Sequence, residues 1–445
     1  MASHPLIGGS GDEVALVDAE DGRSITYAEL DHLVGTRRSE LADLAGGLAF
    51  LGASNDVATV IDYLALTGQG TATALLDPTT AAPAVDDWVA AYRPDAVMAM
   101  RHHAPMLSAA SGPPVDEAVL LTTSGSTGSP KFVRLSAGNI GANANQISAA
   151  LNIDGTERGL AHLPLFYSYG LSVLNSHLVA GATVVLSSAS AIRPEFWQAV
   201  ADHAVTSVPG VPYSYELFLR VGLLTMDLPT VRHLTQAGGR LATAKVLEVQ
   251  EAMTPKGISM WVMYGQTEAS ARISVLPADE LPEQAGSVGY PLPGGAAELL
   301  DVDHDGVGEL VYTGPNVMLG YAAGRDDLGA GDQQQGRLHT GDLASIDESG
   351  RLWIRGRLKR IAKVFGTRVS LDDVEARLGS LGTVAAIDDG ERLAVFVESG
   401  EEIEGLARRI ERELAFPPRS IRAATVDALP TTAAGKVDYE TLRSL

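Results

Sequence analysis

The sequence predicts an α/β protein with a large N-terminal domain of layered α/β subdomains plus a β subdomain, followed by a small α+β C-terminal domain. Three observations predict this fold class. Apolar, β-branched segments alternate with Ala-rich helical segments early in the chain, short strands separated by turns begin near residue 300, and a mixed α/β segment follows Gly356. With 445 residues, 45% of them hydrophobic, the chain can bury more than one large core.

The N-terminal domain is expected over residues 1–358, with buried and partly parallel strands. Its clearest elements are two strands, each followed by a helix: Glu117–Thr123 and Ala137–Leu151, then Ala182–Leu186 and Glu195–Ala204. Ser136 is typical of a helix N-cap, because its hydroxyl can accept a hydrogen bond from an unpaired N–H of the first turn.

Residues from about 290 to 358 are expected to form an antiparallel β subdomain. The expected strands and turns are Ala297–Leu300, Gly308–Tyr312 and Leu352–Arg355, with turns at Asp303–Gly306 and Asp347–Gly350. The polar, Gly-containing segment Gly324–Gly336 is expected to be a mobile surface loop.

The C-terminal domain is expected over residues 359–445, with the boundary at Lys359. Its expected elements are helices at Leu371–Leu378 and Glu404–Leu414 and a strand at Leu393–Val397.

Composition excludes several classes of function. The net charge of -22 argues against a broad electrostatic surface for nucleic acid or anionic lipid. The absence of Cys excludes disulfides, Cys-ligated metals and a thiol nucleophile, and it fits a reducing, cytoplasmic location. Met1–Asp18 lacks the features of a secretory signal, and Leu171–Ala191 contains too many polar residues for a membrane span.

The most informative segment is Leu120–Ser136, in which an apolar strand is followed by glycines, hydroxyls and one lysine. Glycines let backbone N–H groups converge on an anion, and Lys131 adds a mobile positive charge. The residues expected to bind phosphate are Thr123, Ser124, Gly125, Ser126, Thr127, Gly128 and Lys131. The spacing is not that of a Walker A loop, and a Gly/Ser-rich surface turn would have the same composition.

A second cluster, Met263–Ser270, combines an aromatic residue, a glycine and three polar side chains, Gln266, Thr267 and Glu268. Tyr264, before Gly265, offers a flat face to adenine, Thr267 a hydroxyl to phosphate, and Glu268 a hard oxygen ligand to Mg²⁺. A strand end with a solvated Glu is the alternative.

Three further segments could complete a nucleotide site. Gly238-Gly239-Arg240 is a turn that would let a base approach the backbone. In Leu338–Leu343, Asp342 directly follows an expected turn, and its carboxylate could accept hydrogen bonds from both ribose hydroxyls. Arg357 follows fifteen residues later. Lys436, in a Pro/Thr/Gly loop, could offset the repulsion between a carboxylate and an α-phosphate. A structural Asp, a surface Arg and a solvated tail Lys are the alternatives.

Taken in order, these motifs resemble the superfamily of acyl-CoA synthetases, nonribosomal-peptide adenylation domains and firefly-type luciferases. The resemblance runs from about Thr26 to Tyr439 and includes eight motifs in the order of that superfamily. They are Ile25–Leu30, Leu75–Pro78, Leu120–Lys131, Leu163–Gly170, Met263–Glu268, Thr340–Asp342, Gly356–Lys359 and Gly435–Lys436.

The resemblance implies a ligase that joins a carboxylic acid to AMP at the expense of ATP and Mg²⁺, and then passes the acyl group to the thiol of coenzyme A or of a carrier-protein phosphopantetheine. Lys436, Thr267 and Glu268 would be catalytic, Asp342 and Arg357 would bind the ribose, and Glu268 would bind the metal. The C-terminal domain would turn about a hinge at Lys359, replacing Lys436 by the thiol-channel segment that contains Lys363 and Gly366.

The expected acid pocket is formed by Phe166, Tyr167, Ser207, Gly210, Gln236 and Met263. Relatives that take α-amino acids carry an acidic residue in the motif that here reads Phe166-Tyr167-Ser168-Tyr169, so an aryl or small-to-medium acyl acid is expected instead. A basic patch in the sequence, formed by Arg408, Arg409, Arg412, Arg419 and Arg422, could face an acidic carrier protein or the 3′-phosphate of coenzyme A. The alternative is a solvated helix face balanced by Glu411 and Glu413.

Two other functions fit the same motifs. The adenylate could be passed to an amine, to nitrite or to O₂ in place of a thiol. The chain could also be a non-catalytic nucleotide-binding protein of the same fold. Against a loss of catalysis stand five intact residues of the motifs: Lys131, Glu268, Asp342, Arg357 and Lys436.

Overall fold

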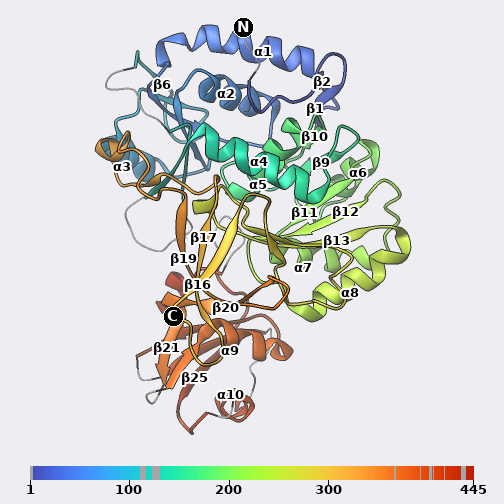
Figure 1. The fold of residues 1–445 in the computed structure, drawn as a ribbon, viewed down its shortest axis with the longest axis vertical. Helices are drawn as coiled ribbons and strands as arrows, with labels where there is room; N and C mark the ends of the chain where they lie inside the picture. The colour runs from blue at the N-terminus through green and yellow to red at the C-terminus, as the bar shows by residue number, and fades with distance from the viewer. Residues whose placement is uncertain are drawn as a thin grey trace.

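A computed structural model describes residues 4–110, 117–122, 131–364, 367–390, 392–399, 403, 405–414, 416–431 and 437–444. The N-terminal part contains two large mixed sheets, each with parallel strands at its centre, and a smaller antiparallel sheet, and the C-terminal part lies below them (Figure 1). None of the described helices is long and apolar enough to span a bilayer.

The described residues form a nine-stranded sheet in the order β15-β14-β13-β12-β11-β9-β10-β1-β2. The strands from β13 to β1 run parallel, and the outer strands at both edges are antiparallel. The strands are β1 Val14–Asp18, β2 Ser24–Thr26, β9 Arg158–Ala161, β10 Thr183–Leu186, β11 Ser207–Gly210, β12 His233–Gln236, β13 Ser259–Tyr264, β14 Ser274–Leu276 and β15 Tyr290–Pro291.

A second, seven-stranded sheet has the order β18-β8-β7-β4-β3-β5-β6 among the described residues. Its strands are β3 Leu48–Gly52, β4 Ala72–Leu76, β5 Ala96–Met98, β6 Met106–Leu107, β7 Val119–Thr122, β8 Phe132–Leu135 and β18 Gly320–Ala322. The expected strands at 117–123 and 182–186 are therefore confirmed as β7 and β10.

Helices lie between these sheets and on their outer faces, which gives the expected layering. Helices α1, α2, α4 and α5 lie between them, because one core joins Leu51 and Leu121 of one sheet to Leu16 and Val184 of the other. Separate cores on the outer faces contain α3 on one side and α6, α7 and α8 on the other. The helices are α1 Tyr27–Glu40, α2 Val57–Gly68, α3 Ala82–Tyr92, α4 Ala137–Leu151, α5 Ser168–Val179, α6 Pro194–Asp202, α7 Pro212–Arg220 and α8 Thr243–Met253.

The β subdomain is confirmed as an antiparallel four-stranded sheet in the described residues, with the order β16-β17-β19-β20. The strands are β16 Ala296–Leu300, β17 Gly308–Thr313, β19 Arg337–Ile346 and β20 Leu352–Arg357. The position of Asp342 differs from the expectation, because it lies within β19 and not after a turn. Glu309 pairs with Leu343 and Val311 with His339, so that Thr340–Asp342 bulge opposite Leu310 alone.

The surface segment Gly324–Gly336 is held against the seven-stranded sheet by hydrogen bonds to two buried charged side chains. The Glu117 carboxylate accepts a 2.7 Å hydrogen bond from Arg134 and a 3.1 Å bond from the N–H of Gly329, and Arg134 donates to the carbonyl of Gly331 at 3.1 Å. Glu117 and Arg134 are side chains without solvent exposure. The segment is a surface loop as expected, but these contacts hold it in place at its centre.

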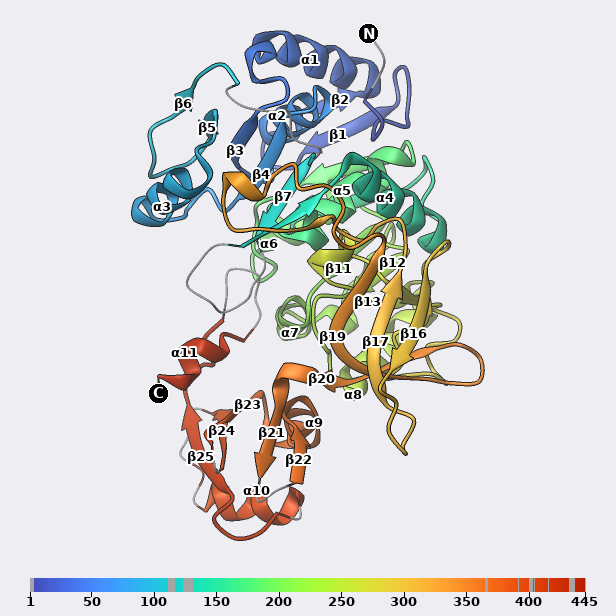
Figure 2. The ribbon, with the colours of Figure 1, turned by 60° about the vertical axis from the view of Figure 1, so that its left-hand side comes forward.

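Residues after Lys359 have cores of their own. One described core packs α9 and α10 against one face of a three-stranded sheet, and another packs α11 against its other face (Figure 2). The elements are β21 Ile361–Val364, β22 Thr367–Ser370, α9 Leu371–Arg377, β23 Val384–Asp388, β24 Leu393–Glu398, α10 Leu406–Leu414, β25 Ile421–Val426 and α11 Tyr439–Arg443. Lys359 lies in the 3-10 turn Leu358–Arg360, at the start of this part.

Candidate active site

The segment Gly265–Arg272 connects two antiparallel strands at the carboxyl end of β13 and carries several predicted site residues. A Cβ at Gly265 would lie 2.0 Å from the carbonyl oxygen of Ala271, so only glycine allows the chain to approach itself this closely. Ser270 and Ala271 have φ angles of 56° and 119°, in the region that L-residues rarely adopt. Such strain persists only where neighbouring groups hold it, and it is concentrated at functional sites.

Buried amides hold this loop. Asn316 donates to the carbonyls of Ala269 at 2.8 Å and Arg272 at 2.9 Å, and the Ser270 hydroxyl donates to the carbonyl of Asn316 at 2.7 Å. Asn143, on α4, donates to the carbonyl of Arg272 at 3.0 Å. The side chains that the loop presents are therefore fixed by the surrounding domain.

Glu268 and Lys131 both contact the side chain of Tyr321, which was not among the site residues expected from the sequence. The Tyr321 hydroxyl, on β18, donates to Glu268 Oε1 at 2.8 Å, and Lys131 Nζ lies 5.1 Å from the centroid of the Tyr321 ring. Burial, and then the Glu268 carboxylate, raises the pKa of Tyr321, so its hydroxyl stays protonated and donates. The Thr267 hydroxyl lies 3.1 Å from that of Ser168, at the start of α5.

These groups fit a magnesium–nucleotide complex. Mg²⁺ usually takes one or two protein carboxylates and completes its coordination with water and phosphate oxygens. The described residues contain no group of three potential metal ligands, so Glu268 fits a metal that phosphates help to hold and not a metal bound by protein alone. The positive charge of Lys131 on the same tyrosine fits an anionic ligand beside it.

Asp342 is the second polar centre. Its carboxylate accepts a 2.5 Å hydrogen bond from the Tyr264 hydroxyl and lies 3.3 Å from Arg357 Nε, across the β19–β20 pair. Burial raises the pKa of Asp342, while Arg357 and the Tyr264 hydroxyl act in the opposite direction. Burial and the Asp342 carboxylate raise the pKa of Tyr264. Tyr264 is thus a hydrogen-bond donor to Asp342, in addition to any stacking on a base.

The glycine turn after β12 lies against the expected acid pocket. Gly238 has a φ of 80°, and a Cβ there would lie 2.4 Å from the Tyr167 hydroxyl, so the turn and Tyr167 are in close contact. The Gln236 amide donates to the carbonyl of Gly239 at 2.8 Å and thereby shapes the turn. Gln266 donates to the carbonyl of Thr340 at 3.3 Å, which joins the two polar centres.

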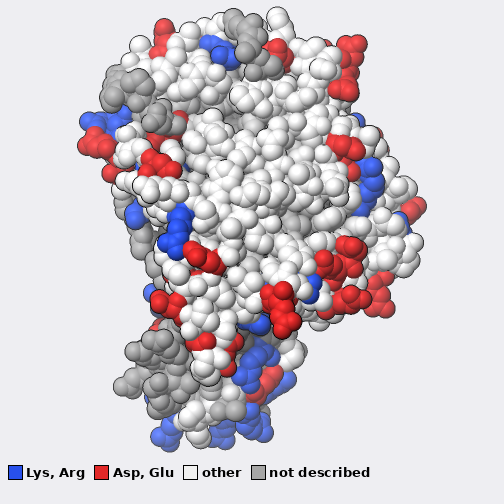
Figure 3. Space-filling model, in the orientation of Figure 1, with Lys and Arg blue, Asp and Glu red and all other residues white. Residues whose placement is uncertain are grey.

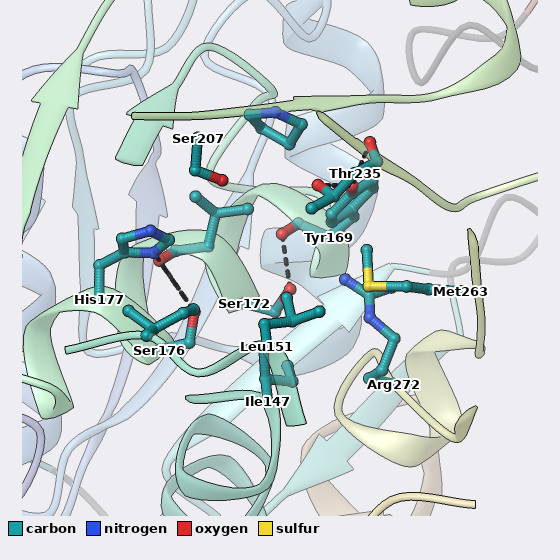
Figure 4. A pocket seen from close by; sticks show the side chains of 13 residues that line it. Ile147, Leu151, Tyr169, Ser172, Ser176, His177, Ser207, Thr235, Met263 and Arg272 are labelled. Atoms are coloured by element: carbon teal, nitrogen blue, oxygen red, sulfur yellow. Dashed lines mark hydrogen bonds between the residues drawn. The ribbon is translucent and has the colours of Figure 1, made fainter. Parts of the chain in front are cut away.

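A small cavity is enclosed by α4, α5, three strands and the end of the Gly265–Arg272 loop (Figure 4). Its volume is about 20 Å³, room for roughly one water molecule. Its lining is Ile147, Leu151, Ile153, Tyr169, Ser172, Val173, Ser176, His177, Ser207, Pro209, Thr235, Met263 and Arg272. Most of these residues are apolar or carry a hydroxyl, which suits a small organic ligand.

The expected pocket residues divide into two groups. Ser207 and Met263 line the cavity. Phe166 packs against the core between the two sheets, and Gly210 lies beneath α7, where a Cβ would be 2.8 Å from the Tyr215 ring. Tyr167 and Gln236 contact the glycine turn, as described above. Arg240 is exposed at the end of that turn.

Several expected site residues lie outside the described residues: Thr123, Ser124, Gly125, Ser126, Thr127, Gly128, Gly366 and Lys436. Lys363 is part of β21, where its backbone pairs with that of Arg368.

Tyr321, Thr235 and Arg272 were not among the site residues expected from the sequence. Arg272 had a signal, because it is the one charged residue in the apolar stretch Ala269–Leu276. Tyr321 had none, since β18 reaches Glu268 only through tertiary packing.

Comparison with known proteins identifies the family. Residues 106–322 match the AMP-binding enzyme family. The 2-succinylbenzoate–CoA ligase of Bacillus cereus (strain Q1) is 32% identical over 347 residues, which cover 73% of this chain and 69% of the relative. The feruloyl-CoA synthase of an Amycolatopsis species is 32% identical over 346 residues, which cover 72% and 68%.

The fold is also that of a solved member. The o-succinylbenzoate CoA synthetase of Bacillus subtilis, in complex with its acyl-adenylate intermediate, superposes with a TM-score of 0.79 at 23% identity, covering 97% of this chain and 95% of that chain. The expected layered α/β fold is confirmed. On the strength of the sequence match and the shared fold, the chain belongs to the AMP-binding, adenylate-forming enzymes, the superfamily that includes the acyl-CoA synthetases.

Proposed function

We propose that the chain uses ATP to activate a carboxylic acid as an acyl-adenylate, releases pyrophosphate, and transfers the acyl group to the thiol of coenzyme A. One observation carries the proposal. The Tyr264–Asp342 pair, Glu268 with Lys131, and the wall of the cavity lie along the single segment 264–272, so a nucleotide and a small acid bound to it would be neighbours. Such proximity supplies much of the rate enhancement in a two-substrate reaction.

Each polar group has a role that its surroundings support. Asp342 would accept hydrogen bonds from the ribose hydroxyls, with Arg357 holding the carboxylate ionised. Thr267 and Lys131 would contact the phosphates, and Glu268 would hold Mg²⁺, which neutralises phosphate charge when bound. The acid carboxylate forms a bond to the α-phosphorus, and the bond to pyrophosphate breaks with its electron pair leaving on pyrophosphate. Lys436 would stabilise the charge that develops between the two anions.

The segment between the domains supports the proposed hinge at Lys359. Arg357 pairs with Asp342 of the N-terminal domain. Arg360 donates to Glu375 at 2.7 Å and to the Tyr439 hydroxyl at 2.9 Å, both in the C-terminal domain. The chain between these two arginines is Leu358-Lys359, and we propose that it absorbs the rotation that would bring Lys363 and Gly366 to the site in place of Lys436.

The basic patch of the C-terminal domain supports a phosphate-bearing acceptor. Basic side chains gather at the lower end of this domain (Figure 3), and Arg408, Arg409, Arg412, Arg419 and Arg422 are exposed. Among the described residues, Arg422 pairs with Asp389, but neither Glu411 nor Glu413 forms an ion pair with this patch. We propose coenzyme A as the acceptor, with a carrier-protein phosphopantetheine as the alternative that shares its chemistry.

The test is acid-dependent exchange of pyrophosphate into ATP, over a panel that includes 2-succinylbenzoate and ferulate, the acids of the named relatives. Exchange with at least one acid is expected, followed by an acyl-CoA mass when coenzyme A is added. The Lys436→Ala variant is expected to lose adenylation but to retain thiolysis of a supplied acyl-adenylate. Absence of exchange with every acid would refute the proposal, and a product mass without added thiol would show a different acceptor.

A further inference from the structure

Arg272 is a buried cation for which the described residues provide no counter-ion. Its side chain is 2% exposed, and among the described residues no carboxylate forms an ion pair with it. Its Nε is fully buried without a hydrogen-bond acceptor in the described part of the chain. The guanidinium lies over the Tyr169 ring, 4.5 Å from its centroid, and this stacking compensates only part of the cost of burying a charge.

Arg134 is the comparison within the molecule: its Nε also lacks an acceptor in the described part of the chain, but its charge is paired. Arg134 is also buried, but its guanidinium donates to Glu117 at 2.7 Å and to the carbonyl of Gly331 at 3.1 Å. The backbone of Arg272 is fixed by Asn143 and Asn316, so its side chain is directed to this position by a built site. Burial lowers the pKa of Arg272, and the hydroxyls of Tyr169 and Tyr167 oppose that shift.

The cavity beside Arg272 contains nothing that could neutralise it. None of the lining residues is acidic. Three of the lining hydroxyls already have partners: the Tyr169 and Thr235 hydroxyls lie 2.8 Å apart, and the Ser172 hydroxyl donates to the carbonyl of Tyr169 at 2.7 Å. The Nε2 of His177 has no partner among the described residues. Burial lowers the pKa of His177, so its ring is neutral at neutral pH and adds no charge to the cavity. The cavity is thus positive and has no anion of its own.

We infer that the acid substrate has two carboxylates. One is activated as the adenylate, and the second, at the opposite end of the substrate, pairs with Arg272. The inference rests on the proposed function and specifies its substrate class as dicarboxylic acids. A guanidinium matches a carboxylate in shape and charge. The cavity volume of about 20 Å³ means that a lining side chain moves to admit the acid, and Met263, unbranched and beside Arg272 in Figure 4, is the most adaptable.

The test compares matched acids in the pyrophosphate-exchange assay. Glutarate is paired with pentanoate, and 2-succinylbenzoate with 4-oxo-4-phenylbutanoate, which lacks the ring carboxylate. We expect kcat/KM for the preferred dicarboxylate to exceed that for its partner by at least about 30-fold, the lower limit for a buried charge pair. Arg272→Gln and Arg272→Met should reduce this ratio to near one, and Arg272→Lys should retain part of it.

Arg158→Gln is the matched control, because Arg158 is a partly buried arginine that donates to the carbonyl of His203 outside the cavity. It should leave the ratio unchanged. Thermal melting and ATP binding of each variant verify that the domain is folded. If no acid supports exchange, the proposed function fails and this inference fails with it. If exchange occurs but only monocarboxylates support it, or the dicarboxylate preference survives in folded Arg272→Gln, the inference alone is refuted and Arg272 serves packing on Tyr169.

Discussion

Replacing Tyr264 by Phe tests the ribose centre, because it removes one donor from a buried carboxylate and keeps the ring. Asp342 is 7% exposed and has two described partners, the Tyr264 hydroxyl at 2.5 Å and Arg357 at 3.3 Å. A hydrogen bond to a charged group contributes about 1.5–3 kcal/mol, so Tyr264→Phe should lower the free energy of unfolding by about that amount. In a protein that already carries Asp342→Asn, Tyr264→Phe should lower the free energy of unfolding by only about 0.5–1.5 kcal/mol, the contribution of a hydrogen bond between uncharged groups.

The same variant should change the pH dependence of ATP use. The Tyr264 hydrogen bond lowers the pKa of Asp342, so its loss raises that pKa. The carboxylate is the form expected to bind ribose, and kcat/KM for ATP should therefore fall at a higher pH in Tyr264→Phe than in the wild type. Tyr63→Phe, which removes a 3.3 Å bond to the neutral Asn175, is the matched control and should leave this profile unmoved. Two results would refute a coupling between Tyr264 and Asp342. One is an equal loss of unfolding free energy from Tyr264→Phe with and without Asp342→Asn, and the other is an unchanged acid side of the kcat/KM profile.

Three further predictions concern the loop, a histidine and the buried ion pair. Gly265→Ala should reduce exchange activity about 100-fold by displacing the loop, whereas Gly141→Ala, in open space on α4, should keep activity and add about 0.5–1 kcal/mol in denaturant titrations. Burial lowers the pKa of His4 from 6.5 to about 4. Its Nδ1 accepts from the N–H of Leu6 at 3.1 Å, so only the unfolded chain binds the proton between these values. Stability should thus fall by about 2 kcal/mol from pH 7 to pH 5, and His4→Asn, which keeps the acceptor, should abolish that slope. Glu117→Gln should lower the free energy of unfolding, measured by denaturant titration, by about 3–5 kcal/mol, because it leaves the buried Arg134 without its counter-ion. A loss below about 1 kcal/mol would contradict a stabilising role for the Glu117–Arg134 pair.

Local signals predicted several elements well. The helix expected over Ala137–Leu151 has those bounds, because Ser136 accepts from the N–H of Asn139 at its start and Asn152 adopts a left-handed conformation at its end. Three strands of the β subdomain, β16, β17 and β20, were placed within a few residues, since turn residues separate them, but β19 was not predicted as a strand.

Features that depend on contacts distant in sequence were not predicted. Thr340-Gly341-Asp342 has the composition of a turn, but Gly341 supplies the positive φ of a bulge whose form depends on pairing with β17. Tyr321 reaches Glu268 from 53 residues away in sequence, and only the antiparallel pairing of β18 with β8 brings it there. The sequence likewise shows a lone Arg272 but not the cavity beside it.

The segment Gly265–Arg272 also constrains how this enzyme could diverge. Its eight residues carry the proposed nucleotide-binding side chains at one end and Arg272, which we infer to face the acid, at the other, on a strained backbone. A substitution that alters acid selectivity at Arg272 therefore risks the geometry of Glu268, four residues earlier. Ser172 on α5 and Ser207 on β11 line the same cavity without sharing that backbone. New acid preferences should thus arise more readily at these two serines than at the arginine, in natural lineages and in directed evolution alike.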